Sequence, residues 1–405
     1  MNVLQTDHHE GPAARLAALR GPAEQRGLDA RALAALAANP GCRRRAVLDA
    51  AGVDKAAVAG RLGRPAPFGR SPFAIARGNI FEARLKADDC AALLTPLRRR
   101  LGLPAEDGAP VLVPDLLTRS GPAVRAARTA QALAEAVADP KAWTLLDHPM
   151  LRLTVAGSPA YLEPDAVVVH DGRCTVVEIK SFPVLDGSAD PAKVGAAARQ
   201  AAVYVLALQE AAGHGAGRGP YEQVELPGSP ELSVLLVCPK DFGNHPTAAV
   251  IDIRRELATT RRQLARMTRI DQLLDALPPG TSFDLAPDAA GQPTRPVAEL
   301  TAAVESVPAA YSPDCLSTCE LGFHCRAQAR CADAVEQLGR GVRGELGSIR
   351  TVHEALAAAY GDASPGRHPQ SNGSPHEAED EAAARLSHAA ALRTEALAAA
   401  REGAA

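Results

Sequence analysis

Three polar residues, Asp165, Glu178 and Lys180, interrupt two apolar, β-branched runs near the middle of the 405-residue chain. Glu178 and Lys180 are two apart, so an extended strand places their side chains on the same face. Asp171-Gly172 separates the runs and is a strong hairpin turn signal, so we expect Asp165 to lie near the other two. Two carboxylates and a lysine at the end of a small sheet can hold a divalent cation and a nearby water. Taken alone, the stretch fits equally well a surface hairpin whose polar residues face water.

Two predicted helices carry residues that bear on this choice. Gln200 and Tyr204 lie four apart on the helix that follows the hairpin, so they share one helix face. By themselves they are typical of an ordinary amphipathic helix. Glu82 lies on a helix predicted upstream of the hairpin and offers a third carboxylate for a metal shell, although in isolation it also fits an exposed helical glutamate.

Composition restricts the functional classes only weakly. The formal net charge of −3 does not indicate nucleic-acid binding, and the local basic run Arg43-Arg44-Arg45 is of a kind that is usually a solvated helix face. The first residues lack the apolar stretch of a signal peptide, and no apolar run is long enough to span a bilayer. We therefore expect a cytoplasmic protein without a membrane partner, whose eight cysteines are thiols or metal ligands.

The cysteines are concentrated near the C-terminal end. Cys315, Cys319 and Cys325 are separated by three and five residues, and Cys331 follows after five more. This density indicates a metal or cluster site, with Cys42 as the remaining ligand. Zinc is the rival occupant, but zinc sites usually consist of two close pairs, whereas a three-plus-one distribution favours an iron–sulfur cluster.

The order of predicted elements favours an α/β fold. Period-two apolar patterns predict strands over 150–155, 166–169, 175–179, 232–238 and 248–253, and helices precede, interrupt and follow them. In outline, the middle of the chain reads helix, three strands, helix, two strands. Such an order is typical of a central sheet flanked by helices, here with helical additions at both ends.

Taken together, these residues resemble the RecB-like branch of the PD-(D/E)XK nucleases, and in particular the iron–sulfur members of the AddB and CRISPR-associated exonuclease type. The resemblance covers about residues 38–335. The matching positions are Pro164-Asp165, Glu178-Ile179-Lys180, the Gln200-to-Tyr204 spacing, Cys42 before Arg43, Arg44 and Arg45, and the later Cys315, Cys319 and Cys325.

The resemblance implies a restriction-endonuclease-like core with a mixed sheet. It also implies a Mg²⁺- or Mn²⁺-dependent deoxyribonuclease, an exonuclease acting on DNA that is single-stranded or has free ends, in repair, recombination or defence. The resemblance implies metal binding by Asp165, Glu178, the Ile179 carbonyl and Glu82, and water positioning by Lys180. It implies that Gln200 and Tyr204 orient the DNA or the catalytic lysine, and that Arg43, Arg44 and Arg45 bind phosphates. It also implies a 4Fe–4S cluster on Cys42, Cys315, Cys319 and Cys325.

The chain departs from the family pattern in two places. Phe81 stands where many members have a histidine after the glycine of the first core helix, here Gly78. Three residues, rather than the usual two, separate Cys315 from Cys319, which leaves Cys331 as a possible substitute ligand. The chain also has no G-x-x-x-x-G-K-[ST] phosphate loop, so any strand unwinding is expected from a helicase partner. The alternative hypothesis is a non-catalytic nucleic-acid-binding or scaffold protein that retains the nuclease fold.

The expected organisation has three parts. Residues 1–37 form a weakly ordered helical arm, and residues 38–340 form the nuclease, with its core over about 74–255 and the cysteine segment over 315–331. Residues 341–405 form a helical, partly disordered tail.

Overall fold

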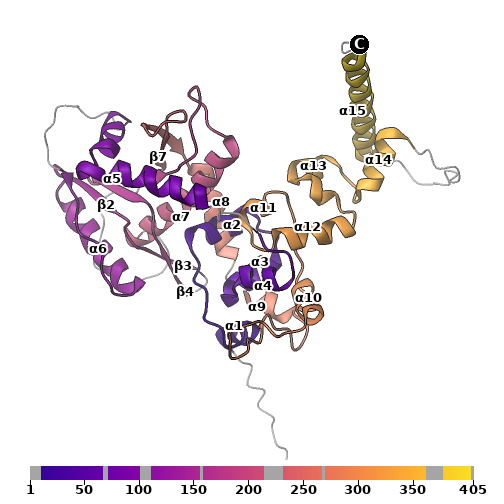
Figure 1. Cartoon of the computed structure of the whole chain (residues 1–405), viewed down its shortest axis with the longest axis horizontal. Coiled ribbons are helices and arrows are strands. Elements are labelled where there is room, and N and C mark those ends of the chain that lie inside the picture. The colour runs from indigo at the N-terminus through magenta and orange to yellow at the C-terminus, as the bar shows by residue number, and fades with distance from the viewer. Residues whose placement is uncertain are drawn as a thin grey trace, which may run out of the picture. The chain divides into compact units, whose positions relative to one another are not determined.

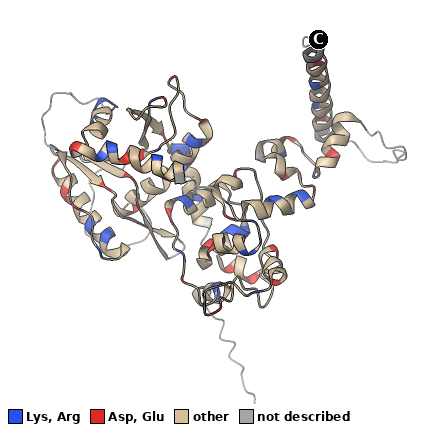
Figure 2. Ribbon diagram, in the orientation of Figure 1, with Lys and Arg blue, Asp and Glu red and all other residues tan. Residues whose placement is uncertain are grey.

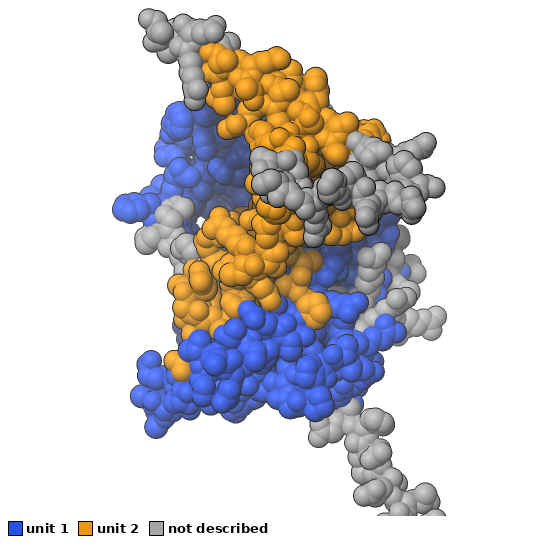
Figure 3. All heavy atoms as spheres, turned by 90° about the vertical axis from the view of Figure 1, so that its right-hand side faces the viewer, with its two compact units in different colours: residues 1–54, 67–307 blue, residues 55–66, 308–405 orange. Residues whose placement is uncertain are grey.

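The computed structural model describes residues 11–66, 72–100, 111–155, 158–213, 231–266, 270–361 and 377–402. The chain divides into two compact units, coloured separately in Figure 3: residues 1–54 with 67–307, and residues 55–66 with 308–405. These boundaries differ from the expected ones, because residues 1–37 belong to the first unit and the division falls at residue 307 instead of 340. The part of the predicted tail over 362–376 lies outside the described residues.

The first unit is built on a mixed six-stranded sheet (Figure 1). Its strand order is β1-β2-β5-β6-β7-β8, with parallel pairing between β1 and β2 and between β6 and β7, and antiparallel pairing elsewhere. The strands are β1 (Val111–Leu112), β2 (Trp143–Asp147), β5 (Ala166–His170), β6 (Arg173–Ile179), β7 (Ser233–Pro239) and β8 (Pro246–Asp252). The α/β prediction with a mixed sheet flanked by helices is therefore confirmed.

The predicted hairpin is β5 and β6. Asp171 and Gly172 both have positive φ, 49° and 68°, as the tight turn requires. Ala166 pairs with Val177 at the open end of the hairpin. Asp147, the last residue of β2, pairs with Ala166. The end of β2, the start of β5 and the end of β6 therefore meet at one edge of the sheet, meaning the side at which these strands begin or end and not an edge strand.

Helices cover both faces of this sheet. On one face α5 (Pro72–Arg100) packs its apolar residues against Val168, Val177 and Ile179, among others. On the other face α7 (Pro191–Ala211) packs against Val167 and Val176. Since Val177 and Ile179 face α5, the intervening Glu178 points to the α7 side.

The remaining elements of the first unit surround this core. A separate two-stranded sheet pairs β3 (Leu151–Val155) with β4 (Ser158–Leu162), so the strand predicted over 150–155 exists but lies outside the main sheet. The other helices are α1 (Pro12–Arg20), α2 (Ala30–Ala38), α3 (Arg43–Ala51), α6 (Pro122–Ala138), α8 (Arg254–Arg266), α9 (Ile270–Asp275) and α10 (Val297–Glu305).

The described part of the second unit is helical. It contains α4 (Lys55–Arg61), α11 (Cys315–Thr318), α12 (Gly322–Cys331), the 3₁₀ helix η2 (Val335–Leu338), α13 (Arg340–Glu345), α14 (Val352–Tyr360) and α15 (Glu377–Glu402). Gly322 lets α12 begin close to α11, because a Cβ at this position would lie 2.6 Å from the carbonyl oxygen of Cys315. This close approach brings the cysteine-bearing segments of the second unit together.

Candidate functional site

The hairpin brings Asp165, Glu178 and Lys180 together at the sheet edge, as their spacing predicted. Asp165 directly precedes β5, and its Oδ2 accepts a hydrogen bond from the backbone N–H of Ile179 at 2.6 Å. The Lys180 ammonium forms an ion pair with the Glu178 carboxylate. The backbone N–H of Lys180 donates to the carbonyl of Val237 in β7 at 2.9 Å, which fixes the end of β6 against its neighbour.

Glu178 is the most deeply buried acid of this group. Its exposed fraction is 1%. Apart from the ion pair with Lys180, neither carboxylate oxygen accepts a hydrogen bond within the described ranges. Burial raises the pKa of the Glu178 carboxyl to about 7, with the Lys180 ammonium opposing the shift. A buried carboxylate with so little hydrogen bonding strongly favours a nearby cation.

Asp165 and Lys180 each favour the charged form of the other. Burial raises the pKa of Asp165, while the Lys180 ammonium and the Ile179 N–H oppose the shift. For Lys180, burial alone would lower the pKa, but the carboxylates of Glu178 and Asp165 outweigh it and raise the pKa. Lys180 therefore stays protonated beside two acids.

Glu82 reaches the same edge from α5. Its Oε1 accepts a hydrogen bond from Lys86 Nζ at 2.6 Å and lies 3.0 Å from His148 Nε2. The contact with His148 lowers the pKa of Glu82 to about 2, assisted by Lys86 and opposed by burial. Phe81, which stands where many of the nucleases that the sequence resembles have a histidine, is 1% exposed and belongs to the apolar core under α5. Position 81 therefore faces the sheet, and Glu82 faces the site.

Three residues of this cluster were not predicted from the sequence: Lys86, Asp147 and His148. Lys86 Nζ lies 2.6 Å from Asp147 Oδ1 and 2.8 Å from His148 Nε2. They were missed because β2, which ends at Asp147, was not recognised as a strand. The available signals were the four-residue spacing of Glu82 and Lys86 and an acid followed by a histidine directly after Leu145-Leu146.

The backbone around His148 is tied to the segment that carries Asp165. His148 has a φ of 44°, an uncommon value for a non-glycine residue. Its N–H donates to the Asp165 carbonyl at 3.3 Å, and its own carbonyl accepts from Arg125 Nη2 at 3.2 Å. Arg125 Nη1 also pairs with Glu163 at 3.0 Å. The contact with Glu82 raises the pKa of His148, although burial opposes this.

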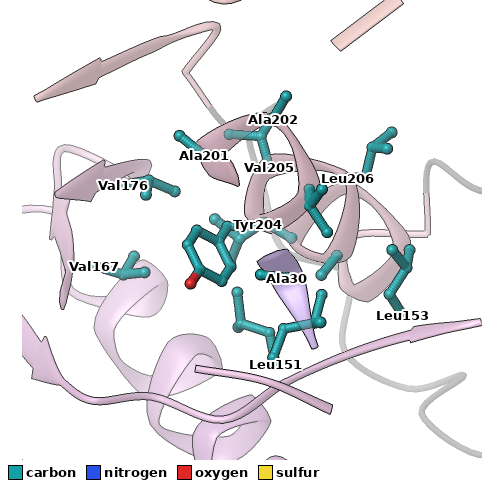
Figure 4. Packing of buried hydrophobic residues seen from close by; sticks show 14 of the residues in the cluster. Ala30, Leu151, Leu153, Val167, Val176, Ala201, Ala202, Tyr204, Val205 and Leu206 are labelled. Atoms are coloured by element: carbon teal, nitrogen blue, oxygen red, sulfur yellow. The ribbon is translucent and has the colours of Figure 1, made fainter. Parts of the chain in front are cut away.

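Gln200 and Tyr204 share one face of α7, as predicted, and form a relay to the hairpin. Gln200 Nε2 donates to the Tyr204 hydroxyl at 2.9 Å, and that hydroxyl donates to the Glu163 carbonyl at 3.1 Å. Figure 4 shows the Tyr204 ring among apolar side chains that include Val167 and Val176. Burial, followed by the charge of Glu178, raises the pKa of Tyr204, so the hydroxyl stays protonated. Tyr204 is thus placed to fix the backbone just before Asp165.

The later cysteines lie in the second unit and Cys42 in the first. Cys315, Cys319 and Cys325 are each 8–9% exposed, and Cys331 is exposed. The N–H of Cys319 donates to the carbonyl of Cys315 at 2.9 Å. Burial raises the pKa of the nearby Tyr311, and the charge of Arg326 opposes this shift.

Only part of the arginine run predicted to bind nucleic acid lies on the surface. Arg44 is 2% exposed and its Nε donates to the Val307 carbonyl at 3.0 Å. Arg45 is 5% exposed and pairs with Asp49 at 3.0 Å. These two guanidinium groups are engaged inside the protein, which corrects the expectation that all three bind phosphate, while Arg43 is exposed. In Figure 2 Lys and Arg are distributed over many elements together with Asp and Glu.

No group of three or more His, Cys, Asp or Glu side chains in the described part of the chain is arranged to hold a metal ion. At the sheet edge, Lys86 and Lys180 contact the carboxylates that such an ion would need. The donor set itself fits a hard divalent cation, because it consists of carboxylates and includes the buried, poorly satisfied oxygens of Glu178.

Comparison with models of known protein families gives no match, and comparison with curated proteins gives none either. None of the described helices combines the length and the apolar character needed to cross a membrane.

Proposed function

We propose that the protein has a restriction-endonuclease-like core and is a Mg²⁺- or Mn²⁺-dependent nuclease that hydrolyses phosphodiester bonds of DNA. The observation that carries the proposal is the carboxylate of Glu178. It is 1% exposed and faces α7, and apart from its contact with Lys180 neither of its oxygens accepts a hydrogen bond from the described residues. An acid buried in this way next to Asp165 costs folding free energy, which a bound cation would offset.

We assign the residues of the site the roles that the resemblance implies. Asp165, Glu178 and the carbonyl of Ile179 would hold the ion, with Glu82 contributing directly or through water. When bound, such an ion lowers the pKa of a water and stabilises negative charge on the scissile phosphate. Lys180, which the two acids keep protonated, would neutralise charge that develops on the phosphate.

Gln200 and Tyr204 would act on the site indirectly. Because the Tyr204 hydroxyl donates to the Glu163 carbonyl, the pair would hold the segment that leads into Asp165. The proposed substrate is DNA that is single-stranded or has free ends, and Arg43 is the member of the basic run that is exposed to contact phosphates.

We further propose that Cys315, Cys319 and Cys325 hold an iron–sulfur cluster. In support, the three thiols are 8–9% exposed and come from α11, its end, and the adjacent α12. Thiolates are the usual ligands of such clusters. Replacement of Cys42 and of Cys331 by serine tests which of the two is the fourth ligand.

The test is DNA digestion by purified protein with Mg²⁺ or Mn²⁺. End-labelled linear single strands, linear duplex and covalently closed circles are offered in parallel. The wild type is expected to degrade linear DNA and to spare closed circles. Asp165→Ala and Lys180→Ala are each expected to lose activity by about 10³-fold, since each removes a charge that acts on the transition state. Lys193→Met is the matched control, because Lys193 is 57% exposed and pairs only loosely with Asp190, at 3.8 Å.

Full activity in both Asp165→Ala and Lys180→Ala would overturn the proposal. DNA binding by the wild type without any cleavage under either metal would instead favour the non-catalytic scaffold.

A further inference from the structure

Lys86, Asp147 and His148 surround Glu82 but have no role of their own in the proposed reaction. Lys86 lies on α5, one turn after Glu82, and its side chain is 15% exposed. Its ammonium lies 2.6 Å from Glu82 Oε1, 2.6 Å from Asp147 Oδ1, 2.8 Å from His148 Nε2 and 3.4 Å from the Asp165 carbonyl. The ammonium therefore donates to Glu82 and to the Asp165 carbonyl, forms an ion pair with Asp147, and contacts the His148 ring.

This arrangement differs from an ordinary helical ion pair. Exposed lysine–glutamate pairs four residues apart contribute little, because water competes for both charges. Lys86 is mostly buried, and its partners come from two separate elements, α5 and the end of β2 with the residue that follows it. The ammonium therefore links the helix to the edge of the sheet.

The contacts of Lys86 connect the two elements that carry the proposed metal ligands. Glu82 is on α5, whereas Asp165 and Glu178 are on the hairpin. In α5, Asp88 and Cys90 have positive φ, 51° and 62°, which lie outside the right-handed helical region. Phe81 and Leu85 pack the first part of α5 against the sheet, and Lys86 adds polar contacts to Asp147 and His148.

We infer that Lys86 is a positioning residue, whose ammonium holds the Glu82 carboxylate at the sheet edge beside Asp165 and Glu178. The inference rests on the proposed function, since it concerns the same site. Without the ammonium, the carboxylates of Glu82 and Asp147 would repel each other, and the contact with His148 would have to hold Glu82 against that repulsion. Loss of such a supporting contact typically weakens metal affinity or activity by about 10- to 100-fold.

The test measures Mn²⁺ binding by isothermal titration calorimetry, together with kcat, KM for single-stranded DNA, and Tm, on the full chain. Lys86→Met is expected to weaken Mn²⁺ binding and lower kcat, each by about 10- to 100-fold, with KM changed less than about threefold. Lys86→Arg keeps the charge and donors and is expected to recover part of both losses. Lys193→Met serves again as the control and should match the wild type.

The alternative outcomes are distinct. Unchanged Mn²⁺ affinity and kcat in a folded Lys86→Met protein would overturn the inference. So would tighter Mn²⁺ binding, because it would mean that the ammonium competes with the metal for Glu82. If Lys86→Met does not fold, Asp147→Asn decides, since it removes one charge that anchors the ammonium and is expected to shift Mn²⁺ affinity in the same direction. A wild type that neither binds Mn²⁺ nor cleaves DNA would overturn the proposed function, and this inference with it.

Discussion

At the scale of single residues, Glu178 has a carboxyl whose pKa is raised by burial and lowered by the neighbouring Lys180 ammonium. The carboxyl is almost completely buried, and its pKa rises from 4.5 to about 7 as a result. Lys180 reduces this shift without removing it. A protein selected only for stability would place an apolar residue here, so the acid is better explained by chemistry than by folding.

The raised pKa of Glu178 predicts a pH dependence of stability in metal-free protein. The folded state holds this proton more tightly than the unfolded state, so the stabilising contribution is complete below about pH 4.5 and is lost as the pH rises through about 7. Glu178→Gln has no such proton to lose. Its free energy of unfolding should therefore increase relative to wild type from pH 4.5 to 7, by on the order of 3 kcal/mol, and then level off.

Urea denaturation in EDTA at a series of pH values measures this difference. Glu299→Gln, which changes an exposed acid in the first turn of α10, is the control and should parallel the wild type. Parallel curves for wild type and Glu178→Gln would show that the carboxyl is already ionised in the folded protein below neutral pH.

At the scale of elements, local signals predicted what the chain does over short distances. The Asp171-Gly172 turn and the apolar, β-branched runs beside it predicted β5 and β6 correctly, because turn conformation and β-branched composition are local properties. The helix starting at Asp190-Pro191 is also confirmed, with the Asp190 side chain accepting a hydrogen bond from the N–H of Ala192. By contrast, β2 was missed, since it has no run of β-branched residues and no hairpin turn beside it.

At the scale of elements, Gly322→Ala tests the close packing of α12 against α11. A Cβ at this position would lie 2.6 Å from the Cys315 carbonyl oxygen and 3.0 Å from its carbonyl carbon, and neither backbone atom can turn aside. Gly322→Ala should therefore push α12 away from α11 and cost about 1–3 kcal/mol of stability. Chemical denaturation followed by circular dichroism measures the loss.

Gly341→Ala is the matched control for this substitution. It lies in a helix of the same unit, and a Cβ there would meet nothing within 4 Å. It should be neutral or slightly stabilising, because alanine favours a helix over glycine. Equal stability of Gly322→Ala and Gly341→Ala would mean that the two helices adapt without cost.

At the scale of the whole molecule, the proposed iron–sulfur cluster is tested by its colour and its iron content. Protein purified without oxygen is expected to be brown, with broad visible absorbance and about four iron atoms per chain. Cys315→Ser, Cys319→Ser and Cys325→Ser should each lose the iron. A colourless protein with stoichiometric zinc would overturn the iron–sulfur assignment.

The fourth ligand is tested by comparing Cys42→Ser with Cys331→Ser. The family resemblance leads us to expect loss of iron in Cys42→Ser and retention in Cys331→Ser. The reverse result would assign the fourth ligand to Cys331, which lies in the same unit as the other three cysteines.

The hairpin, the helix that follows it, and the shared faces of Glu178 with Lys180 and of Gln200 with Tyr204 could be predicted from the amino-acid sequence. These features depend on residues close together in the chain, where turn conformation and periodicity are sufficient. Which distant residues meet could not be predicted in this way. The tertiary structure joined Glu82 and Lys86 to Asp147 and His148, and it buried Arg44 and Arg45, which local composition had placed at the surface. Such contacts depend on how strands order in the sheet and how α5 crosses it, and local patterns do not encode either.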